Sequence, residues 1–320
     1  MGKFLKKNWF VVLAVLIFTG ISTYYIYDTN KGKLKGKEVN GEDVVFTVND
    51  EDTTASGLYD EMYKQRGAST VVALFKQAVA DASVKTTSEM KETAEANADT
   101  IRSNYESYYG TSYESYLESD LLSTGYSDLV EYLVEAQKLQ QVSADYAKAN
   151  FDDLQIRQIS YILIKFEDSE NITDEPTADE QARMDAVDAK LASADFATAA
   201  ADHSEDTSTS SDGGNLGIID KNASSLDSAF LEASLALQEG EVSDWVRSES
   251  FGYFKIYCTA ATAETLEANN DDPYLELVQN YDSSLENLAV WAKASELGVD
   301  FNGNDEIETL VKEQLGVTEE

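Results

Sequence analysis

The chain has 320 residues, of which 24 are lysine or arginine and 60 are aspartate or glutamate, so its net charge is −36. Such an acidic surface would repel phosphate, which excludes a free-standing nucleic-acid-binding protein, while 42% hydrophobic residues argue against disorder along the whole chain. The single cysteine, Cys258, and the single histidine, His203, exclude an intrachain disulfide and any metal site built from several of either residue, and we predict neither a metal nor a cofactor.

A basic, apolar leader precedes a strongly acidic body. Residues 1–37 hold seven lysines and one acidic residue, so residues 38–320 carry 17 basic and 59 acidic side chains, a net charge of −42. The stretch from Trp9 to Tyr27 has no charge, and at ~1.5 Å per residue it would span about 28 Å, close to the thickness of a bilayer core. We therefore predict a cytoplasmic tail over residues 1–8, a transmembrane anchor over residues 9–27 and a linker over residues 28–43.

The leader has a second interpretation, a cleaved signal peptide whose apolar core is Trp9–Phe18. The sequence Thr19-Gly20-Ile21-Ser22 fits poorly to a cleavage site, and no cysteine follows the run closely enough to carry a lipid. Both interpretations stay open. Lysines flank the run on both sides, and those before it lie closer, which favours a single-pass membrane protein with its bulk outside the cell membrane.

Residues 44–151 are predicted to be mostly helical after a short strand at Val44–Val48. Apolar residues recur at helical spacing in two runs that Gly67 separates, and further helices are predicted over residues 88–109 and 113–121 and from a cap at Ser127 to about Asn150. Seven tyrosines lie here: Tyr105, Tyr108, Tyr109, Tyr113, Tyr116, Tyr126 and Tyr132. Their rings either pack between helices with the hydroxyls in water, or line a crevice that grips side chains of unfolded polypeptide.

Residues 152–262 alternate between strand and helix patterns. A strand over Ile156–Phe166 comes first. A capping box at Thr177–Glu180 then opens one helix, and a second helix begins at Phe196. Gly213-Gly214, a helix over residues 227–237 and strands over residues 242–246 and 251–258 follow. This order, β-α-α-(β)-α-β-β, predicts a compact α+β domain. Residues 263–320 return to helix and are too few to fold alone, so we expect them to pack on the first helical region, with the middle domain as an insertion.

Several short motifs of the middle region follow one another in a specific order. They are Phe196 to Ala201 with Asp202-His203-Ser204-Glu205-Asp206, Gly213-Gly214-Asn215-Leu216-Gly217, Phe230 to Leu237, Gly240-Glu241-Val242-Ser243 and Phe251-Gly252-Tyr253. Together they resemble the parvulin-type peptidyl-prolyl isomerases. The whole chain is similar to the PrsA foldases of Gram-positive bacteria. This resemblance implies a helical SurA/PrsA-like chaperone domain (residues 44–151 and 263–320) around an inserted parvulin-like domain (residues 152–262), with unfolded or secreted polypeptides as partners.

The resemblance also implies a site. The wall of an apolar proline pocket falls on Leu216, Leu226 and Phe230, and the acidic position beside the amide falls on Asp206. Leu216 and Phe230 would be core residues in any such fold, and Asp206 has an equal alternative role as a cap or solvated residue of its Ser/Thr loop.

Parvulins typically carry a histidine in the first strand and another in the last, and here these positions are Tyr161 and Phe254. We predict Asp206 and Tyr161 as catalytic residues and list Phe254 with the three pocket residues as substrate-binding. Tyrosine keeps a hydroxyl, but phenylalanine cannot form a hydrogen bond. The chain is therefore either a foldase that isomerises X–Pro bonds or a holdase chaperone whose middle domain is inactive.

Three further features have simpler interpretations. His203 is expected at a helix end, Cys258 as a buried structural thiol, and the glycines of residues 213–217 as turn residues rather than a phosphate loop, because no Lys-Ser/Thr ending follows them. A third function, an acidic wall-associated protein that gathers cations, ranks last because no D-x-D-x-D-G calcium loop is present. The oligomeric state is left open between monomer and homo-oligomer.

Overall fold

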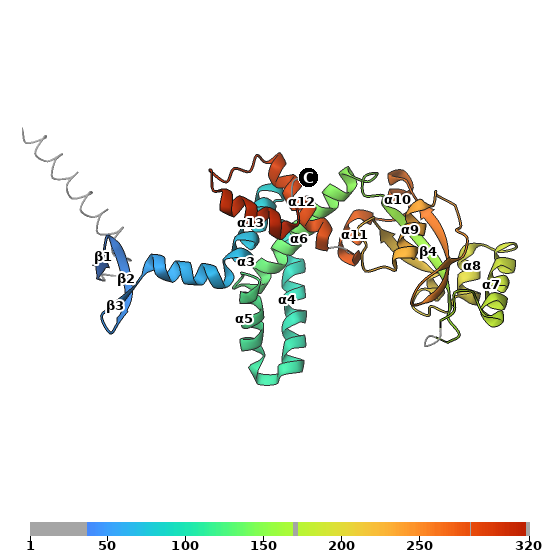
Figure 1. Cartoon of the computed structure of the whole chain (residues 1–320), viewed down its shortest axis with the longest axis horizontal. Coiled ribbons are helices and arrows are strands. Elements are labelled where there is room, and N and C mark those ends of the chain that lie inside the picture. Colours follow the sequence, from blue (N-terminus) through green and yellow to red (C-terminus); the bar gives the residue numbers. More distant parts are fainter. Residues whose placement is uncertain (1–36, 169–171, 282, 318–320) are drawn as a thin grey trace, which may run out of the picture. The chain divides into compact units, whose positions relative to one another are not determined.

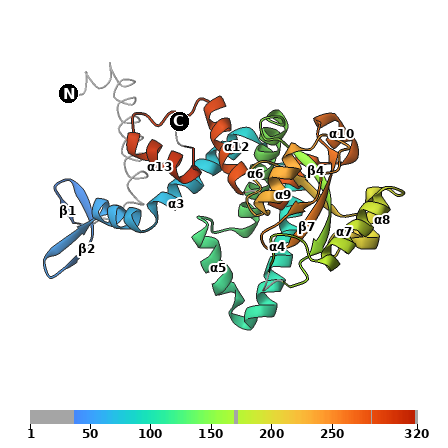
Figure 2. The same cartoon turned by 45° about the vertical axis from the view of Figure 1, so that its right-hand side comes forward.

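The computed structural model describes residues 37–168, 172–281 and 283–317 (Figures 1 and 2). The predicted tail and anchor, residues 1–27, lie outside the described residues. Within the described ranges, no helix combines the length and apolar character that a bilayer crossing requires. The chain divides into two compact units, Met1–Gly67 and Ala68–Glu320.

The first unit contains a three-stranded antiparallel sheet in the order β1-β2-β3, formed by Glu38–Val39, Glu42–Val48 and Glu51–Thr54. Two-residue turns connect its strands. Asn40-Gly41 and Asn49-Asp50 all have positive φ, the conformation that type I′ hairpin turns require and that Asn, Asp and Gly adopt most readily. The predicted strand at Val44–Val48 is confirmed as the greater part of β2.

Helix α3 spans Ala55–Ser83 without a break, so the predicted interruption at Gly67 is wrong. A glycine inside a helix costs only about 1 kcal/mol relative to alanine, and the apolar residues on the carboxyl-terminal side of it outweigh this cost by packing. Val79 is buried there, and the partly buried Val71, Val72 and Phe75 pack with it against the carboxyl-terminal helices.

Three helices continue the helical part of the second unit: α4 (Ser88–Tyr109), α5 (Tyr113–Ser123) and α6 (Leu129–Ala149). The short 3-10 helix η1 (Gly110–Ser112) joins α4 to α5, and the two helices lie side by side as a hairpin in both views (Figures 1 and 2). Thr87 caps α4 by accepting a hydrogen bond from the Met90 amide. Asp128, rather than the predicted Ser127, caps α6, because its carboxylate reaches the Glu131 amide.

The α+β body is built on a four-stranded antiparallel sheet in the order β5-β4-β7-β6. Its strands are β4 (Arg157–Lys165), β5 (Asn215–Ile219), β6 (Val246–Arg247) and β7 (Gly252–Ala260). The helices are α7 (Ala178–Leu191), α8 (Phe196–His203) and α9 (Ser228–Ala236), and η2 (Ser210–Asp212) is a 3-10 turn. The predicted element order is confirmed.

Alternation along β4 assigns its residues to two cores. Ile159 and Leu163 pack with Phe230 of α9, whereas Ile162 and Ile164 pack with Met184 of α7 and with α8. The two faces of the sheet are therefore covered by different helices.

One predicted strand, residues 242–246, is shorter than expected. Only Val246 and Arg247 form β6, and Val242 makes a single bridge to Tyr257. The Ser243 hydroxyl accepts the Ile256 amide at 2.9 Å, so a side chain replaces the ladder hydrogen bond that a longer strand would supply.

The chain then returns to the helical part through α10 (Ala263–Asn269), α11 (Pro273–Tyr281), α12 (Ser283–Glu296) and α13 (Asp305–Leu315). Helices α11 and α12 pack against α6, and Val290 and Val311 join the core around Val79. A second core combines Ala144 and Ala147 of α6 with Leu277 of α11 and Ile218 of β5. This core links the helical part to the α+β body.

Candidate active site

A cavity of about 330 Å³ lies on the α9 side of the sheet. Its walls come from β4, β5, the start of α9, β7 and the loop after α8. The lining residues are Tyr161, Leu163, Lys165, Asp206, Leu216, Ser225, Leu226, Asp227, Phe230, Phe251 and Phe254. All six residues predicted from the sequence are among them, so the structure brings them together, and their roles stay predictions.

An aromatic triad forms the floor of the cavity. Phe230 and Phe254 are buried, with ring centroids 4.9 Å apart, and the half-buried Tyr161 ring packs edge-on against both, at 5.5 and 5.7 Å. Edge-to-face packing of this kind fixes ring orientation as well as burying area. The triad therefore offers a rigid apolar surface of the size of a small ring.

The cap of α9 orients Phe230. The Asp227 carboxylate accepts the Ala229 and Phe230 amides at 3.0 and 3.1 Å and also accepts the Ser248 hydroxyl at 2.7 Å. One side chain thereby ties the helix start to the turn before β7. Ser225 and Leu226, just before this cap, complete the cavity wall.

The polar side of the cavity consists of Tyr161 and Asp206, whose hydroxyl and carboxylate are hydrogen-bonded to each other. Asp206 also accepts the Ser208 amide at 3.0 Å, the Ser208 hydroxyl at 2.7 Å and the Thr209 hydroxyl at 3.2 Å. Partial burial raises the pKa of Asp206, but the hydrogen bonds from Tyr161, Ser208 and Thr209 outweigh it, and the pKa lies below its ordinary value. Asp206 is therefore a carboxylate at neutral pH.

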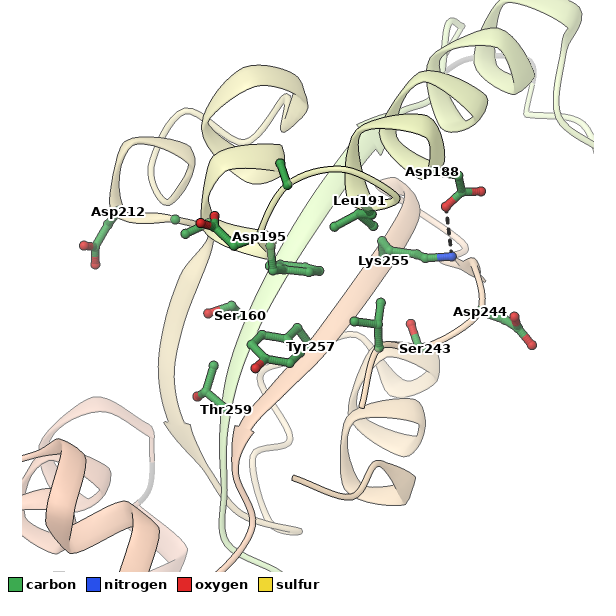
Figure 3. Close-up of a pocket in the computed structure, with 15 residues that line it drawn as sticks. Ser160, Asp188, Leu191, Asp195, Asp212, Ser243, Asp244, Lys255, Tyr257 and Thr259 are labelled. Carbon is green, nitrogen blue, oxygen red and sulfur yellow. Dashed lines mark ion pairs between the residues drawn. The ribbon is translucent and has the colours of Figure 1, made fainter. Parts of the chain in front are cut away.

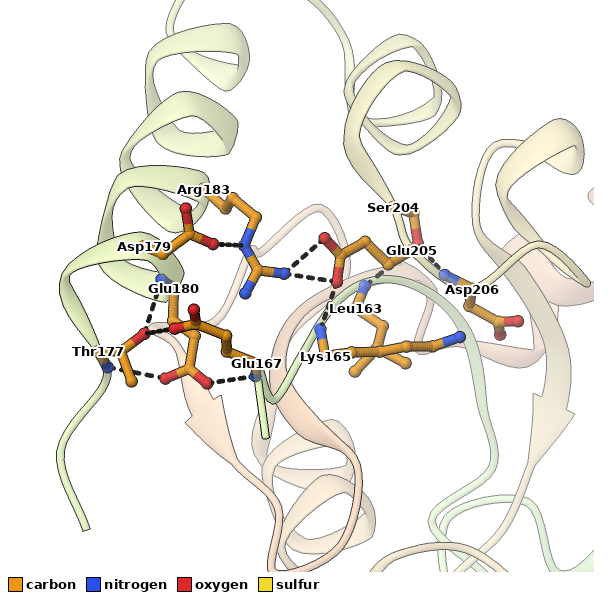
Figure 4. Close-up of polar contacts among 10 residues, drawn as sticks. All are labelled: Leu163, Lys165, Glu167, Thr177, Asp179, Glu180, Arg183, Ser204, Glu205 and Asp206. Carbon is orange, nitrogen blue, oxygen red and sulfur yellow. Dashed lines mark hydrogen bonds and ion pairs between the residues drawn. The ribbon is translucent and has the colours of Figure 1, made fainter. Parts of the chain in front are cut away.

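The segment that carries Asp206 is held against β4 by its two preceding residues (Figure 4). The Ser204 hydroxyl accepts the Leu163 amide at 3.2 Å, and the Glu205 amide donates to the Leu163 carbonyl at 2.8 Å. The Glu205 carboxylate accepts the Lys165 amide at 2.7 Å and pairs with Arg183 of α7 at 2.6 Å. These contacts continue the pairing of β4 beyond the end of β5 and place Asp206 beside Tyr161.

Two glycines bring the next turn close to the same strand. Gly213 and Gly214 have φ of 66° and 79°, which confirms the predicted turn role. The Gly214 carbonyl accepts the Tyr161 amide at 2.8 Å, and a Cβ on Gly214 would lie 2.2 Å from the Tyr161 carbonyl oxygen. Only glycine permits this approach, which sets the backbone of Tyr161.

Five lining residues were missed by sequence reasoning as site residues: Leu163, Lys165, Ser225, Asp227 and Phe251. The Phe251 ring is 55% exposed at the rim, and its position directly before Gly252-Tyr253 was the signal that could have marked it. Lys165 is the exposed last residue of β4. An isolated lysine has no sequence signal, since its place at the rim depends on where β4 ends.

Cys258 and His203 lie outside the cavity. Cys258 is fully buried among Ile159, Phe254 and Ile256, and burial raises the pKa of its thiol to about 11, so the expectation of a structural thiol is confirmed. His203 is the last residue of α8, as predicted. No group of three or more metal-ligating side chains occurs in the part of the chain that the structure describes.

A larger hollow, of about 690 Å³, lies on the opposite side of the sheet (Figure 3). Phe196 and Tyr257 stack there with centroids 5.2 Å apart, and Lys255 pairs with Asp188 at 3.1 Å. None of the six predicted residues lines this hollow. Its size therefore does not make it the candidate active site, because the predicted chemistry converges on the smaller cavity.

Comparison with known proteins gives the class of the α+β body. Residues 161–259 match the family model described as the Rotamase, PPIC-type PPIASE domain. The chain thus contains a domain that resembles peptidyl-prolyl cis-trans isomerases of the parvulin type.

The particular relatives are PrsA foldases. A foldase protein PrsA of Clostridium kluyveri is 36% identical over 106 residues, which cover 32% of this chain and 31% of the relative. One from Clostridium botulinum is 28% identical over 209 residues, 58% of each chain. The crystal structure of PrsA from Bacillus cereus has a TM-score of 0.40 at 18% identity and covers 86% of this chain and 98% of that one. The chain is PrsA-like, as the sequence analysis predicted, and its matches span between about a third and three fifths of the curated relatives' length.

Proposed function

We propose that this chain is a foldase whose α+β body, residues 152–262, catalyses cis-trans isomerisation of X–Pro bonds in secreted polypeptides. The observation that carries the proposal is the apolar cavity with the hydrogen-bonded Tyr161–Asp206 pair at its polar side, in a domain that matches the PPIC-type family. Phe230, Phe254, Leu216 and Leu226 would hold the proline ring.

The reaction needs no covalent step. Rotation about X–Pro crosses a barrier of ~20 kcal/mol because the planar amide has partial double-bond character, with negative charge on its oxygen. A fixed carboxylate beside that oxygen disfavours the planar form more than the twisted one, and burial of the ring in an apolar cavity strengthens the effect. Asp206 is the ionised group in place for this role, and Tyr161 orients it.

A proline-limited refolding assay with the full chain tests this proposal. We expect the wild-type chain to accelerate the slow refolding phase, and Asp206→Ala and Phe230→Ala to lose most of the acceleration. Asp212→Ala, an exposed acid of the same loop, and Phe196→Ala, a buried ring on the other side of the sheet, are matched controls that should keep it. Equal rates for wild type and both site variants would sink the enzymatic proposal.

A second function, a holdase without isomerase activity, is favoured by one observation. Phe254 occupies the position where parvulins carry their second histidine, and its buried ring offers no hydrogen bond to the amide. The holdase predicts that the full chain suppresses aggregation of an unfolded client while leaving the proline-limited phase unchanged, and that Asp206→Ala suppresses aggregation equally well. A client that aggregates as fast with the chain as without it would contradict the holdase function.

We further propose that residues 9–27 anchor the chain in the cell membrane and that residues 44–151 and 263–320 form a chaperone domain outside it. The uncharged run and its flanking lysines support the anchor, and the packing of α11 and α12 on α6 supports the chaperone domain. Protease added to the outside of intact cells should remove the body and leave the anchor in the membrane. A soluble product that begins downstream of residue 18 would instead indicate signal-peptide cleavage.

A further inference from the structure

A cluster of four tyrosine rings, three exposed and one half-buried, covers the end of the α4–α5 hairpin, around η1. Tyr109 lies at its centre, stacked on Tyr116 of α5 at 4.3 Å and edge-on to Tyr108 at 4.8 Å, with Tyr105 at 5.6 Å. The Tyr108 and Tyr116 side chains are 82% and 49% exposed. These four tyrosines are called the tyrosine cluster below.

Packing between α4 and α5 accounts for the Tyr109–Tyr116 stack but not for the ring of Tyr108. A ring that only fills a helix interface is mostly buried, whereas Tyr108 presents almost its whole surface to water. Helix α5 packs mainly against α4 and η1. Exposed aromatic clusters of this kind are typical of binding surfaces, where rigid amphipathic rings supply contact area at low entropic cost.

The hairpin end around the tyrosine cluster is acidic, and Arg102, one turn before Tyr105 in α4, is paired with Asp99 at 3.1 Å. The sequence has no lysine or arginine between Arg102 and Lys138, whereas four acids occur at the hairpin end: Glu106, Glu114, Glu118 and Asp120. Two of them are bonded to tyrosines, since Tyr105 donates to Asp120 at 2.8 Å and Tyr113 donates to Glu114 at 3.5 Å. An incoming ligand therefore meets π faces and carboxylates together.

We propose that the tyrosine cluster binds extended polypeptide segments rich in arginine and lysine. A guanidinium group stacks on a tyrosine face and pairs with carboxylates in the same plane, which uses both features of the surface. Acidic segments would be repelled, and the net negative charge of the body would steer basic ones toward it. The inference rests on the proposed foldase function for its class of partner, but not on isomerase chemistry, because the cluster lies in the α4–α5 hairpin rather than in the α+β body.

Fluorescence anisotropy with the full chain tests the proposal. The probe is a labelled, unstructured peptide with alternating arginine and serine, and its partner probe has glutamate in place of arginine. We expect the arginine peptide to bind, the glutamate peptide not to bind, and the affinity to fall as salt increases. Tyr108→Ser combined with Tyr116→Ser should weaken binding roughly tenfold, the combined effect of losing two cation–π contacts. Tyr108→Phe with Tyr116→Phe keeps the π faces and should bind nearly as well as wild type.

Two readouts separate this proposal from the isomerase one. The double serine variant should keep the proline-limited refolding activity, and Asp206→Ala should keep the arginine-peptide affinity. Because Tyr108 and Tyr116 are exposed, the circular dichroism and thermal midpoint of the serine variant should match the wild type. Equal affinity of the serine variant and wild type, or equal binding of the glutamate peptide, would overturn the proposal whether or not the chain is an isomerase.

Discussion

Asp206 shows at the scale of one residue how a half-buried acid keeps its charge. The hydroxyls of Tyr161, Ser208 and Thr209 and the Ser208 amide all donate to it, and they hold its pKa below the ordinary value against the opposing effect of burial. The same carboxylate thus connects the loop after α8 to β4 and supplies the negative charge of the candidate site.

The lowered pKa of Asp206 predicts the sign of a pH effect on stability. A carboxyl whose pKa is lower in the folded chain stabilises the fold above its unfolded pKa, and this contribution disappears as the pH falls through the folded value. Asp206→Asn should therefore lower the free energy of unfolding by about 1 kcal/mol at neutral pH, a figure reduced by water at a half-buried site. Denaturation between about pH 7 and about pH 2 should show this difference shrinking on acidification. A constant difference would contradict the assignment of the charge to Asp206.

The turn at Gly213-Gly214 acts at the scale of an element, since it fixes where the backbone of β4 meets the site. Gly214→Ala adds a methyl group 2.2 Å from the Tyr161 carbonyl oxygen and strains a φ of 79°. Gly240→Ala is a matched control, because its φ is 81° and nothing lies within 4 Å of the added Cβ.

We expect chemical denaturation to show a loss of about 1–2 kcal/mol for Gly240→Ala and at least ~2 kcal/mol more for Gly214→Ala. The extra loss measures the clash alone, since the conformational strain is common to both variants. Equal losses would mean that the turn can move away from β4.

Helix α6 carries a buried ion pair that its sequence does not reveal. Lys138 and Glu135 are both 4% exposed and lie 3.4 Å apart, and Lys138 also donates to Asp81 of α3. Burial raises the pKa of Glu135. Burial lowers the pKa of Lys138, but its contacts with Asp81 and Glu135 outweigh this and leave the pKa raised.

Removing one partner should cost far more than removing both. Lys138→Met leaves Glu135 buried without its cation and should lower the free energy of unfolding by about 3–5 kcal/mol. Lys138→Met combined with Glu135→Leu should recover most of that loss, because neither charge is then buried alone. Thermal and denaturant unfolding of the two variants checks this, and a double variant as unstable as the single one would contradict it.

At the scale of the whole molecule, the core around Leu277 joins the helical part to the α+β body. It contains Ala144 and Ala147 of α6, Leu277 and Leu285 of the carboxyl-terminal helices and Ile218 of β5. Side chains that are more than 100 residues apart in sequence thus share one apolar environment, which explains why residues 263–320 need not fold alone.

This shared core predicts that damage in α11 is felt in the α+β body. Leu277→Ala, at a fully buried position, should lower the free energy of unfolding by about 2–5 kcal/mol. Cys258 is a natural reporter, because its thiol is buried in the body and reacts only when the body opens. Thiol labelling of Cys258 in native buffer should be faster in Leu277→Ala than in wild type. An unchanged labelling rate would show that the two parts open independently.

The sequence by itself determined the local structure and the kind of domain. Helical spacing, the Thr177–Glu180 capping box and the alternation of β4 are written in neighbouring residues, and the confirmed elements follow from them. The ordered motifs from Phe196 to Tyr253 were enough to indicate a parvulin-like domain. The predicted break at Gly67 was wrong because intrinsic helix propensity is weak compared with tertiary packing. The strand predicted over residues 242–246 is shorter in the structure because the Ser243 hydroxyl, rather than a backbone group, accepts the Ile256 amide.

Only the tertiary structure decided which residues meet. Tyr161 and Asp206 are 45 residues apart, and their hydrogen bond depends on Ser204, Glu205 and the glycine turn holding a loop against β4. The sequence shows the tyrosine-rich stretch and places Phe251 directly before Gly252-Tyr253, but it shows neither the stacking of the rings nor the rim position of Phe251, and it gives no sign that Lys138 is buried. Each of these features depends on the distance between residues that are far apart in sequence. Packing of the folded chain sets such distances, and the residues next to each partner in the sequence do not indicate which residue it will meet.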